Sequence, residues 1–455
     1  MEYPLKKGQR LELDIVRAGD AGSGVAVHEG LTVFVAQTLP GERVRARVTE
    51  VQPRYARAQV EEILTPSARR VEPVCPHAGR CGGCSMQFMD YEAHGQALSG
   101  QVEQLMRRVG GQQGFEMLPI LGMETPWRYR NKAVFRAGSV AGQPRLGFVG
   151  RGTHALAPAT DCLLQTEEAC AAAAAVEGWM RERRVAPYDE RARRGIVRHL
   201  MVRTNRTGGV MAVVVTAGEA LPAKDALVAA LRAAVPGLES VVQNVNPRAT
   251  QEILGRKNRL LFGKERLEDE LMGLRFRLSP LSFYQVNRVQ TERLYAQALE
   301  FAALSGGETV VYAYCGAGTI GLCMARKAGR VVGIEIVPDA VRDAKENAAR
   351  NGVGNAEFLA GACEDVLPRL VEDGLRPDVA VLDPPRKGCE PAVLEAVARS
   401  APRRIVYVSC NPATLARDAK RLAELGYPLR ALRPCDMFPW TGEVECVALM
   451  ERRAI

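Results

Sequence analysis

The sequence lacks the apolar segments that mark a membrane or secreted protein. No stretch of the 455 residues approaches the roughly 18 consecutive apolar residues that a membrane-spanning helix needs. The first ten residues, MEYPLKKGQR, contain no apolar core of a secretory signal. Aromatic residues make up only 5% of the chain, and its most apolar runs, such as VMAVVVTAG at 210–218, are no longer than a strand. We therefore expect a cytoplasmic protein without membrane contact, long enough for two or three domains.

Cysteine is not scarce, but its twelve residues are too scattered for the disulfide framework of a small secreted domain. In a cytoplasmic chain this usage indicates metal binding or catalysis. The net charge of +9, from 61 Lys and Arg against 52 Asp and Glu, suits a polyanionic partner such as a nucleic acid. Solvated helix faces would give the same excess, so the charge alone does not identify the partner.

Two short β-branched runs, at 379–382 and 405–408, are typical of buried parallel strands. Each is followed by a polar residue in a loop that proline makes rigid: Asp383 begins Asp-Pro-Pro, and Cys410 lies in Ser-Cys-Asn-Pro. Proline continues neither a helix nor a ladder, so both residues are aimed out of the sheet. Ligands bind at this carboxyl edge in open α/β sheets. A lone cysteine is more often a packing residue, but this position favours catalysis.

The sequences DPPRKG (383–388) and SCNPATLARD (409–418) together resemble the RNA 5-methyluridine methyltransferases, which use S-adenosylmethionine. The resemblance implies that the Cys410 thiolate adds to C6 of uracil, which makes C5 nucleophilic enough to take a methyl group. Some local feature must lower the thiol pKa from about 8.5, and the sequence does not show which. We expect Asp383 to serve both the cofactor and the uracil edge, and the target uridine to be flipped into the pocket.

The C-terminal stretch DMFPWTGEVECVAL (436–449) resembles the family pattern DMFPHTxHVExVxL. Glu445 stands at the glutamate of that pattern, and we expect it to remove the C5 proton after methyl transfer. Trp440 and Glu443 replace two histidines. In a regular strand Glu443 would project from the same face as Glu445, which makes it the competing base.

A glycine turn follows a further predicted strand in TVVYAYCGAGTIGL (309–322). Its glycines allow a ligand to approach the backbone, and the next strand ends at Glu335, which can accept hydrogen bonds from ribose hydroxyls. A dinucleotide is the alternative ligand, but the full Gly-x-Gly-x-x-Gly is absent, which favours S-adenosylmethionine. Ala362 stands where the family often has Asp or Asn. The cofactor contacts of the family correspond here to Gln285, Tyr314, Thr319, Glu335 and Asp383.

Residues 1–65 alternate apolar and polar positions between glycine-rich turns, which predicts a small all-β module. This part resembles the TRAM domain, a five-stranded barrel of the oligonucleotide-binding type. We take the carboxylates on these strands to be fewer than the arginines, and we therefore expect a basic surface that binds phosphates. Its members are Arg43, Arg45, Arg47, Arg54 and Arg57.

Four cysteines form a candidate metal site. Cys75, Cys81 and Cys84 are separated by five and then two residues, and Cys162 lies far downstream. Four thiolates can hold zinc or an iron–sulfur cluster, and the spacing does not separate the two. Iron–sulfur members of the resembled family carry a [4Fe–4S] cluster on this pattern. The resemblance therefore implies such a cluster, bound by all four cysteines and with a structural or RNA-contacting role.

An amphipathic helix is predicted near 91–112, where it could pack on the methyltransferase part. Alternating strands and helices follow from 125 to 280, with two arginine-rich segments that are candidates for RNA contact, although plain surface is equally expected for the second. The first segment carries Arg128, Arg130, Asn131 and Lys132, and the second carries Arg191, Arg193, Arg194 and Arg198.

Together these predictions describe a multi-domain protein. Residues 1–65 form a TRAM β-barrel, residues 66–278 a central α+β domain that holds the iron–sulfur site and binds RNA, and residues 279–455 an α/β, Rossmann-like methyltransferase domain. We expect a monomer that acts on 23S rRNA, because the bacterial transfer-RNA members of the resembled family lack the barrel and the cysteines. Transfer RNA is the alternative substrate. The substitutions at Ala362, Trp440 and Glu443 motivate a rival function, that of a non-catalytic RNA-binding or assembly factor.

Overall fold

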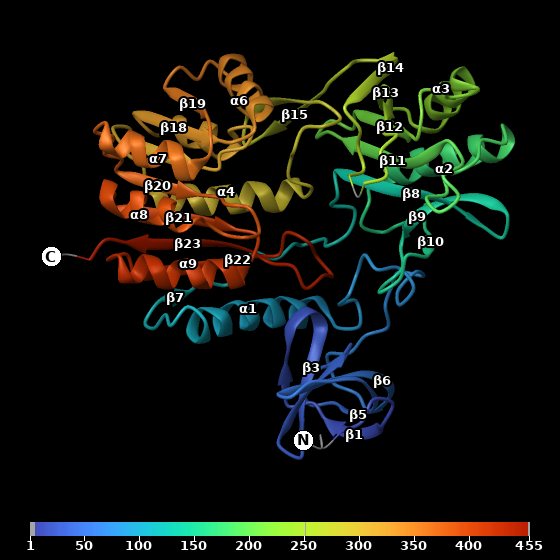
Figure 1. Cartoon of the computed structure of the whole chain (residues 1–455), viewed down its shortest axis with the longest axis horizontal. Coiled ribbons are helices and arrows are strands. Elements are labelled where there is room, and N and C mark those ends of the chain that lie inside the picture. The colour runs from blue at the N-terminus through green and yellow to red at the C-terminus, as the bar shows by residue number, and fades with distance from the viewer. Residues whose placement is uncertain (1–4, 251, 454–455) are drawn as a thin grey trace.

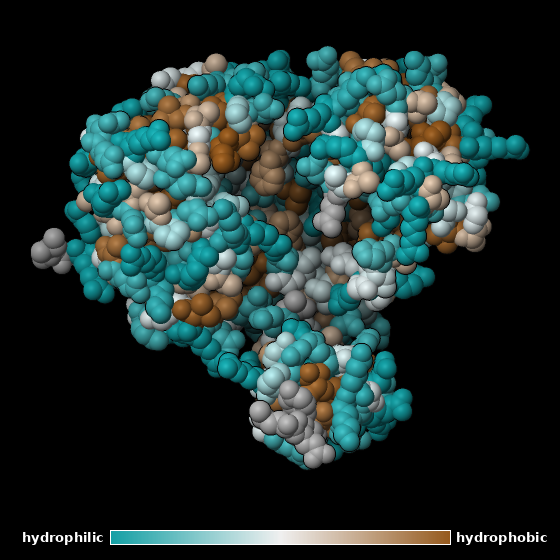
Figure 2. Space-filling model, viewed as in Figure 1, coloured by the Kyte–Doolittle hydropathy of each residue, from teal (hydrophilic) through white to brown (hydrophobic). Residues whose placement is uncertain are grey.

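The computed structural model describes residues 5–250 and 252–453 and arranges them in three bodies (Figure 1). A small barrel lies at the bottom of the view, a central lobe at the upper right, and a larger C-terminal lobe at the upper left. Figure 2 shows a hollow between the two upper lobes, with apolar atoms visible inside it. None of the helices in these residues is long and apolar enough to span a membrane.

The barrel is a six-stranded sheet in the order β1-β5-β6-β4-β3-β2. It closes because the chain turns after β1, so that the Val16 amide donates to the Val25 carbonyl and β2 pairs with β3. Alternate residues face inward, and Leu13, Val35 and Val44 are among those buried in its core. Its strands are β1 (Arg10–Asp14), β2 (Arg17–Ala18), β3 (Ser23–His28), β4 (Leu31–Ala36), β5 (Arg43–Val51) and β6 (Tyr55–Thr65).

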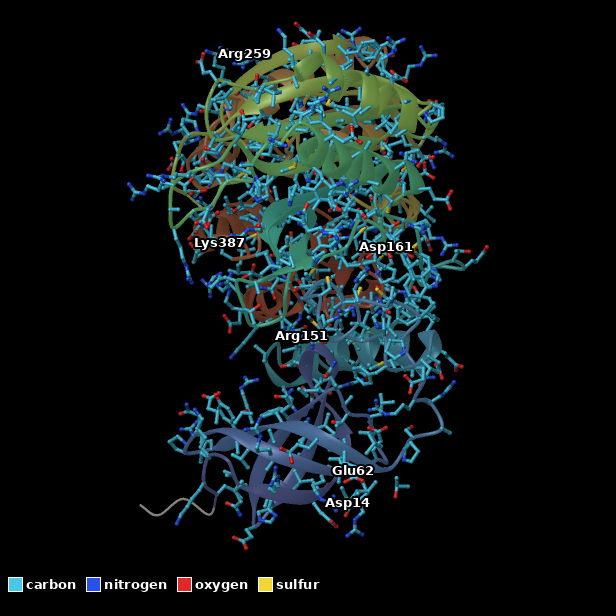
Figure 3. All side chains as sticks on the ribbon, turned by 90° about the vertical axis from the view of Figure 1, so that its right-hand side faces the viewer. Asp14, Glu62, Arg151, Asp161, Arg259 and Lys387 are labelled. Atoms are coloured by element: carbon cyan, nitrogen blue, oxygen red, sulfur yellow. The ribbon has the colours of Figure 1, made fainter. Side chains whose placement is uncertain are left out.

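The outer face of the barrel is not basic, and our expectation for it is wrong. Residues 1–65 contain nine Lys and Arg and also nine Asp and Glu. The β1–β5–β6 register places glutamates beside the arginines, and Figure 3 shows Asp14 and Glu62 on the barrel. The pairs are Arg43–Glu12, Arg45–Glu12, Arg45–Glu62, Arg47–Glu61 and Arg57–Glu50. Cross-strand pairing thus neutralises these arginines, so the barrel adds nothing to the net charge.

The central lobe is built on a seven-stranded sheet in the order β10-β9-β8-β11-β12-β13-β14. Helices α2 (Glu167–Glu182) and α3 (Lys224–Ala234) cover one face, where Phe135, Leu200 and Val202 are fully buried with them. The strands are β8 (Lys132–Val140), β9 (Gln143–Val149), β10 (Leu156–Pro158), β11 (Val197–Thr204), β12 (Val210–Thr216), β13 (Leu238–Val245) and β14 (Lys257–Gly263).

The C-terminal lobe is an eight-stranded sheet in the order β19-β18-β17-β20-β21-β23-β22-β7. Strands β17 (Thr309–Ala313), β18 (Arg330–Glu335), β19 (Ala356–Ala360), β20 (Val379–Leu382) and β21 (Arg404–Ser409) are parallel. Strand β23 (Glu445–Glu451) runs antiparallel between β21 and β22 (Leu429–Cys435). Two apolar cores cover the two faces, as expected for a mostly parallel sheet. The helices are α4 (Arg288–Ala302), α5 (Thr319–Ala325), α6 (Pro338–Arg350), α7 (Cys363–Glu372), α8 (Pro391–Ser400) and α9 (Pro412–Glu424).

Two segments before residue 279 join this lobe. Helix α1 (Tyr91–Arg108) buries Leu98, Val102 and Met106 in the same core as residues of α9, and β7 (Glu116–Met117) pairs with β22. The hairpin of β15 (Leu267–Leu271) and β16 (Leu274–Leu278) packs into the core on the other face. The interval 66–278 therefore contributes to two lobes.

Candidate active site

Three adjacent strands bring Asp383, Cys410 and Glu445 to one edge of the C-terminal sheet. Asp383 follows β20 and Cys410 follows β21, so both leave at the carboxyl ends of parallel strands. Strand β23 runs the other way beside β21, with Ser409 opposite Cys446, so its first residue, Glu445, lies at the same edge. The carboxyl groups of Glu445 and Asp383 both raise the pKa of the Cys410 thiol, as only close neighbours do.

The two carboxyl groups are held in an environment that favours their protonated forms. Glu445 is 4% exposed, and burial together with the nearby Asp383 raises its pKa to about 8. Burial raises the pKa of Asp383 to about 7, although the Tyr312 hydroxyl donates a hydrogen bond of 3.2 Å to it. Acids with pKa values near neutrality are suited to proton transfer.

The Cys410 thiol is half-buried, and burial is the main cause that raises its pKa. The Arg386 guanidinium acts in the opposite direction and lowers the thiol pKa. Arg386 is thus the local cation that sequence reasoning could not identify. It also pairs with Glu443, which is exposed and precedes β23. The strand begins only at Glu445, so Glu443 does not share its buried position.

The loop that carries Asp383 is fastened to helix α9, which begins just after Cys410. The Asn411 amide donates to the Arg386 carbonyl at 2.9 Å, and the Arg417 guanidinium donates to the Lys387 carbonyl at 3.0 Å. The Asp418 carboxylate accepts the Cys389 amide at 2.8 Å and the Tyr407 hydroxyl at 2.7 Å. These bonds fix the loop that carries Asp383 relative to the turn that carries Cys410. Sequence reasoning missed Asp418, although it lies within the recognised SCNPATLARD motif.

The predicted cofactor residues lie along the same edge, where β17 sits between β18 and β20. The Glu335 carboxylate accepts the Gly316 amide at 3.0 Å and the Val337 amide at 2.9 Å, which holds it against the glycine turn. Gly318 has φ +78°, and a Cβ atom there would come within 2.8 Å of the Phe358 ring, so only glycine fits.

The other predicted contacts are partly exposed at this edge. The Thr319 hydroxyl lies 2.9 Å from the Tyr295 hydroxyl, and Tyr314 adopts a left-handed φ of +63°. The Gln285 carbonyl accepts a bond of 2.9 Å from the Asn131 amide, which ties this segment to the central lobe. Ala362 is at the N-cap of α7 and provides no side-chain acceptor. Gln285, Tyr314, Thr319, Glu335 and Asp383 are all partly exposed.

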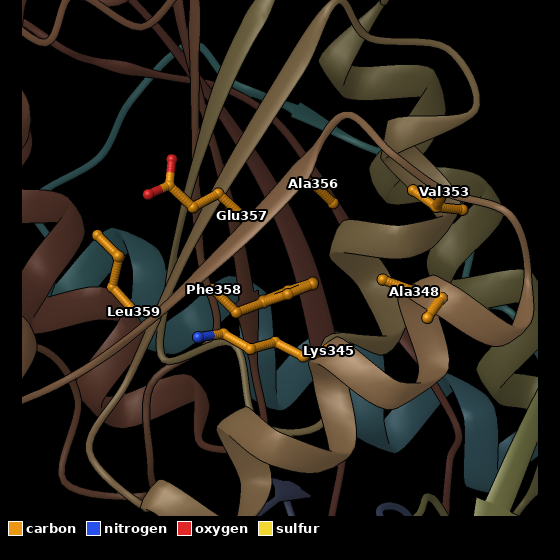
Figure 4. Close-up of a pocket in the computed structure, with 8 residues that line it drawn as sticks. Lys345, Ala348, Val353, Ala356, Glu357, Phe358 and Leu359 are labelled. Carbon is orange, nitrogen blue, oxygen red and sulfur yellow. The ribbon is translucent and has the colours of Figure 1, made fainter.

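A depression elsewhere on this lobe is separate from the site. It is lined by residues of α6 and of the edge strand β19, among them Lys345 and Phe358 (Figure 4). None of the predicted catalytic or cofactor residues lines it.

The four predicted metal ligands share one neighbourhood between the barrel and the central lobe. Burial is the main cause that raises the pKa of Cys84 to about 12, and the neighbouring thiols of Cys162, Cys75 and Cys81 contribute to the same shift. Within the described residues, no three His, Cys, Asp or Glu side chains meet the geometry for a single metal ion. Cys170 donates weakly to the Cys162 carbonyl, consistent with a packing role.

Several predicted RNA contacts instead hold the structure together. The Arg128 guanidinium donates to the carbonyls of Cys162 and Gln165 at 2.8 and 3.0 Å, which braces the segment around the fourth cysteine. Arg198 is 5% exposed and donates to the Asn246 carbonyl at 3.0 Å. In the second arginine-rich segment, Arg191, Arg193 and Arg194 are exposed.

Trp440, which replaces a histidine of the family pattern, lies in the loop before β23 and links this loop to the cysteine segment, the stretch that carries Cys75, Cys81 and Cys84. Its carbonyl accepts the amides of Ser85 and Met86 at 2.9 and 3.0 Å, directly after Cys84. Its indole donates to the Pro126 carbonyl at 3.0 Å and stacks on Trp127 with a centroid distance of 4.9 Å. The substitution thus adds the indole contacts to Pro126 and Trp127, whereas the two carbonyl bonds belong to the backbone, and no local signal in the sequence could reveal either.

Comparisons with known proteins agree with this geometry. A family model described as tRNA (Uracil-5-)-methyltransferase matches residues 243–453, and a TRAM domain model matches residues 4–60. An uncharacterized RNA methyltransferase of Halalkalibacterium halodurans is 43% identical over 451 residues, covering 99% of this chain and 98% of the relative. Another, of Caldanaerobacter subterraneus subsp. tengcongensis, is 42% identical over 449 residues, covering 98% and 99%.

The whole fold also occurs in a solved structure. The Pyrococcus abyssi tRNA (uracil-54, C5)-methyltransferase, in complex with S-adenosyl-L-homocysteine, superimposes with a TM-score of 0.78. The match covers 96% of this chain and 99% of that one, at 24% identity, and so establishes a shared architecture. With the near full-length relatives and the two matching models, it follows that this chain belongs to the RNA (uracil-5-)methyltransferase family and is an RNA methyltransferase with an N-terminal TRAM domain.

Proposed function

We propose that this enzyme transfers a methyl group from S-adenosylmethionine to C5 of a uridine in RNA, through a covalent bond between Cys410 and C6 of the base. The observation that carries this proposal is the meeting of Cys410, Asp383 and Glu445 at one sheet edge, with both carboxyl pKa values raised toward neutrality. A thiol beside two acids of this kind matches a reaction that needs a nucleophile and later a base.

In the proposed mechanism the Cys410 thiolate forms a bond to C6, and the electron pair of the C5–C6 double bond moves toward the C4 carbonyl. Carbon 5 then takes the methyl group that S-adenosylmethionine supplies. Glu445 removes the remaining proton from C5, the double bond re-forms, and the Cys410–C6 bond breaks to return the thiolate. Asp383, protonated near neutral pH, can donate a hydrogen bond to the uracil edge.

We assign the cofactor site to the sheet edge beside the loops that carry Asp383 and Cys410. Glu335 is the proposed acceptor for the ribose hydroxyls, in exchange for one of its two backbone bonds. The partly exposed side chains at the same edge provide the remaining contacts. They are Gln285, Tyr314, Thr319 and Asp383.

We further propose that Cys75, Cys81, Cys84 and Cys162 bind a [4Fe–4S] cluster. The support is a set of four neighbouring thiols, together with the family resemblance. The role assigned to the cluster is structural, because the reaction involves no electron transfer. The amides that follow Cys84 donate to the Trp440 carbonyl, so a cluster that orders the cysteine segment would also order the loop before β23.

The proposed substrate is 23S rRNA, modified by a monomeric cytoplasmic enzyme. Transfer RNA is the second candidate, because the Pyrococcus abyssi enzyme whose fold matches along nearly the whole chain is a tRNA (uracil-54, C5)-methyltransferase. A non-catalytic role is disfavoured because Cys410, Glu445 and Asp383 are all present and brought together.

The deciding experiment maps 5-methyluridine across total RNA of a strain that lacks the gene, beside its parent. Loss at a position of 23S rRNA, restored by the wild-type gene but not by Cys410→Ala, is the expected result. Loss confined to transfer RNA would select the second candidate. An unchanged map in all RNA would refute the proposed activity.

A further inference from the structure

The excess positive charge of the chain is concentrated in one interval. Residues 66–278 contain 30 Lys and Arg against 21 Asp and Glu, whereas residues 279–455 contain 22 of each. The barrel is also balanced, so the central interval accounts for the whole net charge of +9. Within it, residues 128–206 hold 15 basic and only seven acidic side chains. This stretch includes the two neighbouring strands β8 and β11.

The register of these strands places cations directly opposite each other. Lys132 on β8 faces Arg203 on β11. Further along the same two strands Arg136 faces His199, but burial lowers the pKa of that imidazole to about 4, so only the first pair joins two cations. Because side chains alternate along a strand, these residues share the face that α2 and α3 do not cover. Like charges in directly opposite positions destabilise a sheet, so this pairing calls for an explanation.

The cations at one end of this face have no carboxylate partner. In residues 5–250 and 252–453, no Asp or Glu oxygen lies within 4 Å of Lys132, Arg203 or Arg130, and the ammonium group of Lys132 makes no hydrogen bond there. Arg203 is 3% exposed and donates to the Ser282 carbonyl, but its Nε–H has no partner. The Nε–H of Arg130 is likewise buried without one. Arg45 and Arg47 of the barrel, by contrast, are paired with glutamates.

Burying a cation without a partner costs free energy. At Lys132 this cost appears as a lowered pKa of the ammonium group. Burial and the neighbouring guanidinium groups of Arg203 and Arg130 lower the pKa of its ammonium group to about 8. A bound anion would reverse this effect, because it would pair with the ammonium and occupy the free N–H donors. Phosphate is the anion that arginine and lysine bind best together.

We infer that Lys132, Arg203 and Arg130 form a binding site for a backbone phosphate of the RNA substrate, close to the reacting nucleotide. The inference rests on the proposed function and adds the place where the RNA backbone is held. Arg203 donates hydrogen bonds to the carbonyls of Pro280 and Ser282, in the segment that leads to Gln285. The Arg130 guanidinium lies 5.9 Å from the centroid of the Phe438 ring, in the loop before β23 that leads to Glu445. A phosphate bound here positions the strand and carries no sequence information itself.

Lys132→Met tests the site, since methionine keeps the length of the side chain and removes its charge. RNA affinity for a short uridine-rich RNA should fall at least about tenfold, the value of one charge-assisted hydrogen bond. The slope of log affinity against log salt should become shallower by about 0.7, as for the loss of one phosphate contact on a single strand. The affinity for S-adenosylmethionine should be unchanged, which distinguishes an RNA phosphate from the cofactor carboxylate.

Two further variants make the result decisive. Lys132→Arg retains the charge and should keep the wild-type salt slope. Lys224→Met removes an exposed charge from α3, on the covered face of the same sheet, and should change neither quantity. The melting temperature of Lys132→Met should equal or exceed that of the wild type, because repulsion and buried charge are removed.

Three outcomes would overturn the inference: a wild-type salt slope in Lys132→Met, a lowered melting temperature in that variant, or a loss confined to cofactor affinity. The first removes the phosphate contact, the second makes the lysine a structural residue, and the third reassigns the anion. Failure of the proposed function is a separate result, namely that the wild-type enzyme forms no 5-methyluridine in any RNA. Binding and salt dependence can be measured whichever result is obtained for the product.

Discussion

Replacement of the buried carboxylate Glu445 by glutamine gives the sharpest test of the proposed chemistry. Glutamine keeps the size and one hydrogen bond but cannot accept the C5 proton. Addition of Cys410 to the base and methyl transfer should proceed, after which the enzyme should stall with methylated RNA covalently bound. We expect a band that resists denaturation on a gel and a turnover reduced by about 10²–10⁴, the usual contribution of a positioned base.

The pKa values of the site give this prediction a pH dependence. With a pKa of about 8, only about one tenth of Glu445 is ionised at pH 7. When proton removal limits turnover, the wild-type rate should therefore rise about tenfold per pH unit below pH 8. The glutamine variant should lose this rise. Above pH 8, where Glu445 of the wild type is mostly ionised, the adduct of the variant should also form faster, because the Glu445 carboxylate raises the pKa of the Cys410 thiol.

Glu443→Gln is the matched control, two residues away on the same segment. Glu443 is exposed and paired with Arg386, so its replacement should leave elimination normal and trap no RNA. The reasoning would be refuted if Glu443→Gln accumulated the covalent product while Glu445→Gln turned over at the wild-type rate. That result would assign the base to the exposed residue despite its position before the strand.

Four further predictions concern other parts of the molecule. Cys410→Ala should abolish both turnover and the covalent adduct while calorimetry shows unchanged affinity for S-adenosylmethionine; residual adduct would exclude Cys410 as the nucleophile. Iron and sulfide analysis should find about four of each per chain, and stoichiometric zinc without sulfide would contradict the cluster. Arg45→Ala in the ion-paired barrel should leave RNA affinity within about twofold and the salt slope unchanged; a shallower slope would restore a phosphate contact to the barrel. The folded pKa of Glu445 lies near 8, above its unfolded value of 4.5, so the folded state holds its proton to a higher pH. Urea unfolding should therefore show that the free energy of unfolding falls by about 1.4 kcal/mol for each pH unit as pH rises from 4.5 to 8, and this fall should be absent in Glu445→Gln.

The sequence alone predicts what depends on short-range patterns. Asp383 and Cys410 can be assigned to strand ends because a β-branched run and a proline exit are both local signals. The choice between Glu443 and Glu445 cannot be made in this way, since it depends on where β23 begins. The expected charge of the barrel is wrong on a count that the sequence itself provides, nine basic and nine acidic residues in 1–65, whereas pairs such as Arg45–Glu62 are set by the register of two strands. The packing of the helix near 91–112 on the methyltransferase part can be predicted from its apolar face, but its partner α9 cannot, because the two helices lie more than 300 residues apart.

The carbonyl of Trp440 also has a consequence for the order of assembly during synthesis. Its two amide partners, on Ser85 and Met86, leave the ribosome about 355 residues before it does. Domains generally fold from the N-terminus as they are made, yet the cysteine segment has no partner for these amides until the loop around 440 has been translated. For the proposed cluster, this order of synthesis predicts that loading into a fully anchored segment is a late event, and that a chain truncated before Trp440 acquires iron poorly.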